Sequence, residues 1–161
     1  MNSSAPQTIF ARGAWYVVIQ GMLICLILFG PQGAPLVSSE PFITILQSCG
    51  IAIGFLACLI MAIAVINLGK NFTPLPCPKD GAVLIQAGLY RFVRHPIYFG
   101  VLLAALAWLC LFPGVYVFAY SIGLFFLFDI KARREEVWLL ERFPSYRNYQ
   151  IKVKKLIPAI Y

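Results

Sequence analysis

Residues Gly88 to Gly100 read G-L-Y-R-F-V-R-H-P-I-Y-F-G and lead directly into a long apolar run. The stretch holds the one histidine of the chain, His95, between Arg94 and Pro96. Because proline favours the first position of a helix, the motif predicts a helix that begins at Pro96. The free backbone N–H groups and the dipole at such a start favour an anion. Cationic residues at the start of an apolar helix usually mark a functional site.

The apolar run is one of several, and together they set the fold class. Of 161 residues, 61% are hydrophobic and only 12% are charged, whereas soluble domains carry roughly 25% charged residues. Three long runs contain no charge at all: 13–39, 41–69 and 96–128. Since a helix needs about 20 apolar residues to cross a bilayer, we predict an all-α integral membrane protein with about four transmembrane helices. We expect one domain, 1–161, with two N-terminal spans in 1–69.

Helix-breaking residues divide these runs. The first two helices are expected at 14–29 and 41–68, with a glycine- and proline-rich loop between them. The third begins at Pro96, and Pro113-Gly114 turns the chain into the fourth. The third and fourth spans are therefore predicted to form a helical hairpin.

The hairpin is short for a bilayer. Residues 96–128 number fewer than the roughly 40 needed for two full spans, and 129–142 are rich in strong helix formers. We therefore expect the fourth helix to continue past the membrane edge as a cytoplasmic C-terminal extension, ending at Phe143-Pro144. The tail, 146–161, is expected either on the membrane surface or folded back over the loop before Pro96.

The basic residues fall in three groups along the chain. One precedes the first span, four lie between the second and third, and eight follow the fourth. The loops 30–40 and 112–114 have none, so with four spans all basic segments lie on one side of the membrane. The positive-inside rule then places both termini in the cytoplasm. We expect a multi-pass protein in the cell (inner) membrane of a prokaryote.

Composition also restricts the partners. A net charge of +7 suits either nucleic acid or anionic lipid, and in an apolar chain we favour topology and membrane lipids over nucleic acid. The five cysteines form no C-x-x-C pair and the chain has one histidine, so we expect no metal site. Motifs of phosphate-binding loops, dinucleotide folds and common hydrolases are absent from the sequence.

The first candidate site is Arg94-His95-Pro96. Arginine suits a bidentate contact to a carboxylate or phosphate, and Gly100, one turn beyond Pro96, is expected to leave room for a ligand. The alternative is that Arg94 and His95 extend to lipid headgroups.

The second candidate site is Glu135-Glu136. One carboxylate suits an amino group or a ribose diol, while Lys131, Arg133 and Arg134 suit an anionic substrate. The alternative is a set of helix ion pairs, because Lys131–Glu135 and Asp129–Arg133 are each four residues apart.

The motifs together resemble a known family. The pattern L-I-x-x-G-x-Y-x-x-x-R-H-P-x-Y-x-G begins at Leu84, E-E-x-x-L at Glu135, F-x-x-Y-x-x-Y at Phe143 and I-P at Ile157. This order is similar to that of the isoprenylcysteine carboxyl methyltransferase and phospholipid methyltransferase superfamily. The resemblance covers roughly the C-terminal half; the first two spans match only in kind.

The resemblance implies S-adenosylmethionine as methyl donor, bound on the cytoplasmic side by the loop and hairpin within 70–161. The donor-binding residues it implies are Val83, Leu84, Ile85, Gly88, Tyr90, His95, Pro96, Ile97, Tyr98, Gly100, Glu135 and Glu136. The implied substrate and catalytic residues are Arg94, His95, Lys131, Arg133 and Arg134. At the family's basic substrate position this chain has Lys131 instead of arginine, with Arg133 and Arg134 as the alternatives.

The implied reaction is methyl transfer to a lipophilic substrate from the bilayer, above all the carboxylate of an isoprenylcysteine-like molecule. Two alternatives stay open. One is N-methylation of a phospholipid headgroup, and the other is a non-enzymatic scaffold or carrier that retains the fold. Neither the acceptor nor the oligomeric state follows from the residues.

Overall fold

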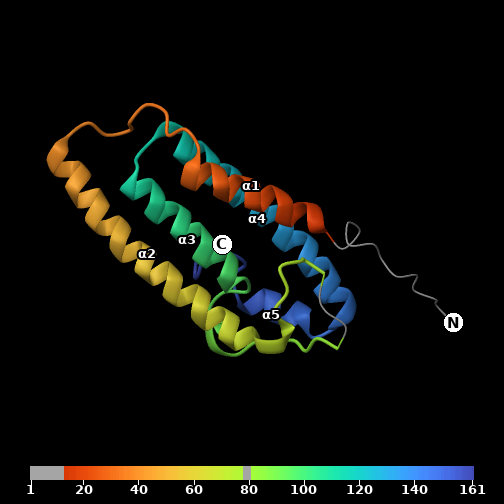
Figure 1. The fold of residues 1–161 in the computed structure, drawn as a ribbon. Coiled ribbons are helices and arrows are strands. Elements are labelled where there is room, and N and C mark those ends of the chain that lie inside the picture. Colours follow the sequence, from red (N-terminus) through yellow and green to blue (C-terminus); the bar gives the residue numbers. More distant parts are fainter. Residues whose placement is uncertain (1–12, 78–80) are drawn as a thin grey trace.

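The computed structural model describes residues 13–77 and 81–161, and its regular elements are helices (Figure 1). The long helices are α1 (Ala14–Phe29), α2 (Glu40–Leu68), α3 (Pro96–Leu111) and α4 (Val115–Arg142), and α5 (Tyr146–Lys152) is short. Two 3-10 turns, η1 (Gly69–Asn71) and η2 (Gly88–Arg91), lie between α2 and α3. The predicted all-α fold is confirmed.

Local signals set the helix ends. Pro96 occupies the first turn of α3 as predicted, and Pro41 does the same in α2. The fourth helix does continue beyond Phe128, because it ends at Arg142, directly before Phe143-Pro144. The expected short turn lies between Leu111 and Val115.

Two helices are long and apolar enough to cross a membrane. They are Glu40–Asn71 and Val115–Arg142, whose most apolar stretches have mean hydropathies of 2.8 and 1.6. The other two, α1 and α3, are apolar but 16 residues long, which is below the roughly 20 residues of a full span. Length and composition therefore support membrane insertion of α2 and α4 directly.

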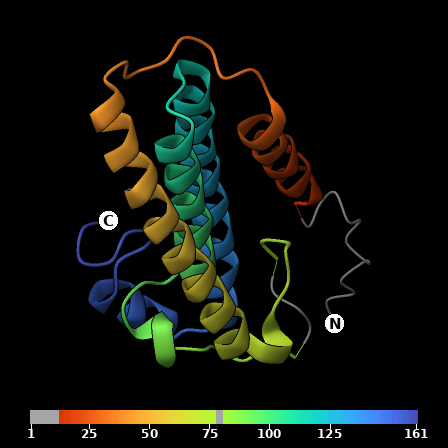
Figure 2. The same cartoon turned by 60° about the vertical axis from the view of Figure 1, so that its left-hand side comes forward.

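Small residues bring α2 and α3 together along their length (Figures 1 and 2). A Cβ atom built on Gly50 would lie 2.9 Å from the Ala107 carbonyl oxygen, and one on Gly100 would lie 2.4 Å from Cγ of Met61. Gly100 thus faces α2, and the expectation that it leaves room for a ligand is wrong. Its missing side chain instead allows close helix packing.

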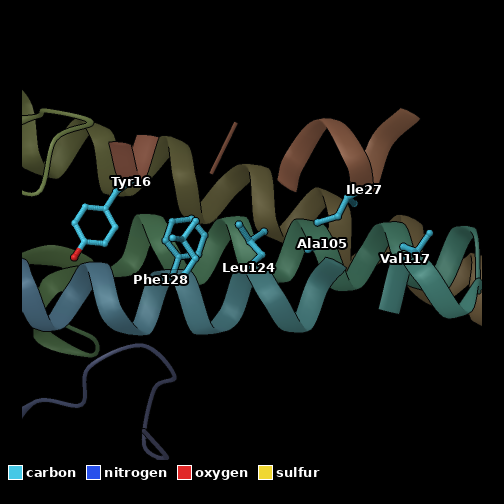
Figure 3. Close-up of a cluster of buried hydrophobic side chains, with 7 residues drawn as sticks. Tyr16, Ile27, Ala105, Val117, Leu124 and Phe128 are labelled. Atoms are coloured by element: carbon cyan, nitrogen blue, oxygen red, sulfur yellow. The ribbon is translucent and has the colours of Figure 1, made fainter. Parts of the chain in front are cut away.

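Helix α1 packs on α4 and completes the bundle. Tyr16 and Ile27 of α1 join Leu124 and Phe128 of α4 and Ala105 of α3 in one buried cluster (Figure 3). In contrast, large apolar side chains on the outer faces are exposed, such as Phe29 (83%) and Phe55 (75%). An apolar surface of this kind suits contact with lipid.

The two ends of the bundle differ in chemistry. At one end lie the loops 30–39 and 112–114, both without basic residues (Figure 2), and backbone hydrogen bonds link this region. The N–H of Leu36 donates to the carbonyl of Pro113 at 2.7 Å and that of Val115 to Ala34 at 3.0 Å. The charged end of α4, α5 and the loop before α3 lie at the other end. Arg12 and Lys79 lie outside the described residues.

The tail folds back over the loop before α3, which is one of its two expected positions. The backbone N–H of Arg94 donates to the carbonyl of Lys154 at 2.8 Å, and that of His95 donates to Lys155 at 3.1 Å. These bonds hold the segment after α5 against the start of α3. The R-H-P motif therefore lies between the helix bundle and the tail.

Candidate functional site

A cavity with two adjacent parts opens at the charged end of the bundle. The loop chamber, about 620 Å³ with its open side, is lined by Leu68, Asn71, Thr73, Ala82, Val83, Leu84, Ile85, Tyr90, Arg94, His95, Glu135, Leu139, Phe143, Tyr146 and Tyr149. The helix chamber, about 640 Å³, is lined by Gln20, Leu68, Phe72, Thr73, Pro74, Tyr90, Arg94, His95, Ile97, Tyr98, Val101, Phe128, Lys131 and Glu135. Six residues line both chambers, so the two are adjacent. Both volumes include the open side toward solvent.

Two asparagines hold the wall of the loop chamber. The Oδ1 atom of Asn71 accepts a hydrogen bond from the backbone N–H of Val83 at 3.0 Å, and Oδ1 of Asn67 accepts one from Leu89 at 2.9 Å. Gly88 has a φ of +61°, and a Cβ atom there would lie 2.0 Å from Asn67 Oδ1. Gly88 therefore lets the chain pass over Asn67 and lines neither chamber.

Glu135 is the carboxylate between the two chambers. Its Oε2 accepts a hydrogen bond from the Tyr98 hydroxyl at 2.8 Å and lies 3.6 Å from Nδ1 of His95. The rings of His95 and Tyr98 are parallel, with centroids 5.2 Å apart, and Tyr98 also stacks on Phe128 at 4.7 Å. The start of α3 and the end of α4 thus form one polar and aromatic wall.

Glu136 has a different environment. It is buried, and its Oε1 accepts from Nε of Arg94 at 2.7 Å and lies 3.1 Å from Nε2 of His95. Tyr146 and Gln150 of α5 also donate to it, at 3.3 Å and 3.0 Å. Glu136 lines neither chamber. Its carboxylate joins α3 and α4 to the tail.

Arg94 is occupied by the same connection. Besides Glu136, its guanidinium donates to the backbone carbonyls of Gln150, at 3.0 Å, and Val153. Arg94 lines both chambers. However, its guanidinium, which was expected to contact a ligand, is hydrogen-bonded to Glu136 and to the tail. The alternative that Arg94 and His95 extend to lipid headgroups is also wrong, because His95 is 6% exposed and both side chains contact Glu136.

Lys131 is the buried cation of the helix chamber. It is 2% exposed, and its Nζ donates to Oε1 of Gln20 at 2.8 Å. The same atom lies 5.0 Å from the ring centroid of Tyr98 and 5.8 Å from that of Phe128. Among the described residues no carboxylate forms an ion pair with it. The expected Lys131–Glu135 helix pair is therefore not formed.

The two alternative cations lie away from the cavity. Arg133 donates to Asp129 at 2.8 Å, as the helix spacing predicted, and to the Tyr161 hydroxyl at 3.1 Å. The guanidinium of Arg134 lies 4.9 Å from the ring centroid of Trp138. Neither arginine lines either chamber, so Lys131 is the one of these three cations that lies on the cavity wall.

Three tyrosines complete the loop chamber. Burial raises the pKa of the hydroxyls of Tyr90, Tyr146 and Tyr149 well above the usual value, and the Glu136 carboxylate beside Tyr146 raises it further. All three hydroxyls therefore stay protonated near neutral pH. Tyr149 donates its proton to the carbonyl oxygen of Tyr90, so α5 also fixes η2.

Most of the residues expected to bind the donor gather around the cavity. Those on its walls are Val83, Leu84, Ile85, Tyr90, His95, Ile97, Tyr98 and Glu135. Four others lie elsewhere: Gly88, Pro96, Gly100 and Glu136. Sequence reasoning missed Gln20, although a single amide in the apolar sequence of α1 was a signal for it.

Comparisons with known proteins identify relatives of this chain. Residues 50–141 match the model of the isoprenylcysteine carboxyl methyltransferase (ICMT) family. The protein-S-isoprenylcysteine O-methyltransferase of Schizosaccharomyces pombe is 30% identical, over 92% of this chain and 68% of that protein. The methanethiol S-methyltransferase of Pseudomonas deceptionensis is 41% identical, over 52% of this chain and 31% of that protein.

A solved structure shares the fold. The eukaryotic intramembrane Ras methyltransferase ICMT superposes on 99% of this chain with a TM-score of 0.66 and 23% identity. This chain spans 55% of that solved chain. At this identity the likeness is one of fold, and the apolar helices agree with a protein embedded in a membrane. The matched segment, the relatives and the R-H-P and E-E motifs together show that this chain belongs to the isoprenylcysteine carboxyl methyltransferase family.

Proposed function

We propose that this protein is an S-adenosylmethionine-dependent membrane methyltransferase that acts on the carboxylate of an isoprenylcysteine-like or other lipid-like molecule. The observation that carries the proposal is the two-part cavity, with Glu135 between a polar loop chamber and a chamber that holds a buried cation. A transferase needs two ligands side by side, and the two chambers are adjacent, with Glu135 in the wall of both.

The loop chamber suits the methyl donor. Its Glu135 carboxylate matches an amino group or a ribose diol, the Tyr90 hydroxyl can donate a hydrogen bond, and Val83 and Leu84 supply an apolar wall. When bound, S-adenosylmethionine supplies an electrophilic methyl group, whose transfer to a carboxylate breaks one S–C bond, forms one O–C bond and leaves the electron pair on sulfur.

The helix chamber suits an anionic acceptor with an apolar body. A buried ammonium without a carboxylate partner is costly, and an acceptor carboxylate near Lys131 would offset that cost. The side chains of Ile97, Val101 and Phe128 provide apolar walls for the rest of the molecule. A headgroup amine, being cationic at neutral pH, fits this chamber less well.

The residues of the chain have little proton chemistry to perform. A carboxylate acceptor has no proton to lose, so no general base is required. The site has to align two reactants and exclude water, which favours a step in which opposite charges disappear. The stacked rings of His95, Tyr98 and Phe128 provide a rigid surface for that alignment.

A thiolate acceptor is a second candidate. The relative with 41% identity over half of this chain is named as an S-methyltransferase of methanethiol. A thiolate is an anion as well, so Lys131 would serve it in the same position. The chemical class that both candidates share is an anionic nucleophile.

Topology belongs to the same proposal. We place all four long helices in the membrane, with α3 and α4 as a hairpin, because α1 and α3 are apolar throughout. The cavity and both termini then lie on the cytoplasmic side, where the basic segments are. We expect this membrane to be the cell (inner) membrane of a prokaryote.

Donor binding and methyl transfer test the proposal directly. Titration calorimetry of the detergent-purified protein with S-adenosylmethionine should show saturable binding, and Glu135→Gln should weaken it about tenfold or more, since it removes a hydrogen bond to a charged group. Glu141→Gln is the matched control, because Glu141 is exposed on the same helix and should leave affinity unchanged.

Labelled donor then identifies the acceptor. Prenylcysteines, alkyl thiols and aminophospholipids are offered in parallel, and label should enter the carboxylate or thiol compounds. Absence of donor binding at millimolar concentration would refute the enzyme and favour a carrier. Label found only in aminophospholipids would refute the anionic acceptor.

A further inference from the structure

We infer that Gln20 of α1 is a positioning residue for the acceptor: it holds the Lys131 ammonium in the helix chamber without cancelling its charge. The inference rests on the proposed function and extends it to a helix outside residues 50–141, the segment that matches the family. It assigns to α1 a part in acceptor recognition in addition to its packing on α4.

The geometry places Gln20 in the cavity. Its Oε1 accepts the hydrogen bond from Nζ of Lys131 at 2.8 Å, and Gln20 lines the helix chamber together with Tyr98 and Phe128. The two residues are 111 positions apart in the sequence. The contact therefore joins the first helix to the charged end of the fourth.

The environment of Lys131 explains why an amide matters there. The ammonium is 2% exposed; it donates to one amide oxygen, faces two aromatic rings and interacts electrostatically with Glu135 beyond ion-pair distance. In the described part of the chain, the other two strongly buried basic side chains differ, because Lys155 and His95 each have a carboxylate within 4.0 Å. The Lys131 ammonium is thus oriented by an amide, and none of the described carboxylates lies at ion-pair distance from it.

Glutamate at position 20 would have nearly the same size and the opposite effect. Its carboxylate would form a buried ion pair with Lys131 and remove the charge that attracts an anion. The affinity for a neutral acceptor would not fall with this change. The amide of Gln20 is therefore expected to set a preference for anionic over neutral ligands.

A purely structural role for Gln20 makes different predictions. Polar side chains in membrane helices often join neighbouring helices by hydrogen bonds. In that case Gln20→Glu, which keeps and strengthens the contact to Lys131, would preserve the fold and leave ligand selectivity as it was. Selectivity, and not stability, is therefore the decisive measurement.

The experiment compares two ligands that differ in one charge. N-acetyl-S-farnesylcysteine and its neutral carboxamide compete for the purified protein in the presence of S-adenosylhomocysteine, and the ratio of their dissociation constants is measured. The wild type should prefer the carboxylate about tenfold or more, and Gln20→Glu should abolish that preference. Affinity for S-adenosylhomocysteine should stay within about twofold.

Two further variants show whether Gln20 acts through Lys131. Gln20→Met should raise KM for the carboxylate substrate more than it lowers kcat, and should have no added effect in a Lys131→Met background. Gln47→Glu is the matched control, since it makes the same change in α2, where the amide contacts the carbonyl of Leu111. It should leave the preference intact.

Each result has one interpretation. Suppose that the wild type binds S-adenosylhomocysteine. The role of Gln20 is then refuted if Gln20→Glu retains the preference for carboxylate, or if the effects of Gln20→Met and Lys131→Met simply add. In both cases the proposed function stands. If the wild type binds no S-adenosylhomocysteine, the proposed function fails first and this inference falls with it.

Discussion

Glu135 and Glu136 are adjacent in the sequence and both lie near His95, but their other partners differ. Consecutive helix residues are about 100° apart around the axis, since a turn takes 3.6 residues. One carboxylate therefore faces the cavity and Tyr98, and the other faces Arg94 and the tail. The E-E pair thus combines a carboxylate on the cavity wall, which we propose binds the donor, with a structural ion pair.

The two glutamates should accordingly fail in different ways. Glu136→Gln leaves the Arg94 guanidinium without its carboxylate at a site where both side chains are 10% exposed, so we expect a loss of about 3 kcal/mol in the free energy of unfolding. Thermal unfolding in detergent measures this loss, with Glu135→Gln for comparison. Equal melting temperatures for the two variants would contradict the assignment.

The cations can be separated in the same manner. Lys131→Met removes the buried ammonium of the helix chamber and should raise KM for a carboxylate acceptor about tenfold or more. Arg133→Ala and Arg134→Ala remove side chains that contact Asp129 and Trp138 outside the cavity, and should change KM by less than about twofold. Initial rates with a prenylcysteine substrate decide between them. A large rise in KM for either arginine variant would support the alternative that Arg133 or Arg134 binds the substrate.

At the scale of elements, the close packing of α2 on α3 positions the helix that begins at the R-H-P motif. Gly50 and Gly54 lie one turn apart on α2, but only the first is in tight contact. A Cβ atom on Gly50 would meet a backbone oxygen at 2.9 Å, whereas one on Gly54 would lie 3.6 Å from the Cβ of Ala107. The backbone cannot move aside as a flexible side chain can.

Gly50→Ala and Gly54→Ala therefore form a matched pair. Gly50→Ala should destabilise the protein by about 1–3 kcal/mol through overpacking. Gly54→Ala should be neutral or stabilising by up to about 1 kcal/mol, because alanine has the higher helix propensity. Chemical unfolding followed by circular dichroism compares them. A larger loss for Gly54→Ala would show that the helices approach each other differently.

At the scale of the whole molecule, the sequence predicts best what is decided locally. Helix ends are predicted from Pro96 and from Phe143-Pro144, and apolar segments from the uncharged runs. Each of these signals lies within a few residues of the feature that it predicts. The contact between Gln20 and Lys131, and the pairing of Arg94 with the tail, join segments 111 and 59 residues apart. Such contacts depend on the packing of all four helices, which no local pattern specifies.

The same long-range packing buries the tyrosines, and their burial limits the stability of the fold at alkaline pH. Burial raises the pKa values of Tyr90, Tyr146 and Tyr149 in the folded state, whereas in the unfolded chain they return to about 10. The folded state thus holds protons that the unfolded state releases. This contribution to stability is complete below pH 10 and is lost as the pH rises above it.

The free energy of unfolding should therefore fall above pH 10 with a slope of up to about 1.4 kcal/mol per pH unit for each such tyrosine. Tyr149→Phe removes one titrating group, together with its bond to the Tyr90 carbonyl. It should be less stable at pH 8 but lose stability less steeply between pH 10 and 11. Chemical unfolding of both proteins across this range measures the two slopes. Parallel curves would mean that Tyr149 titrates alike in both states, and that the tail does not bury it against the loop.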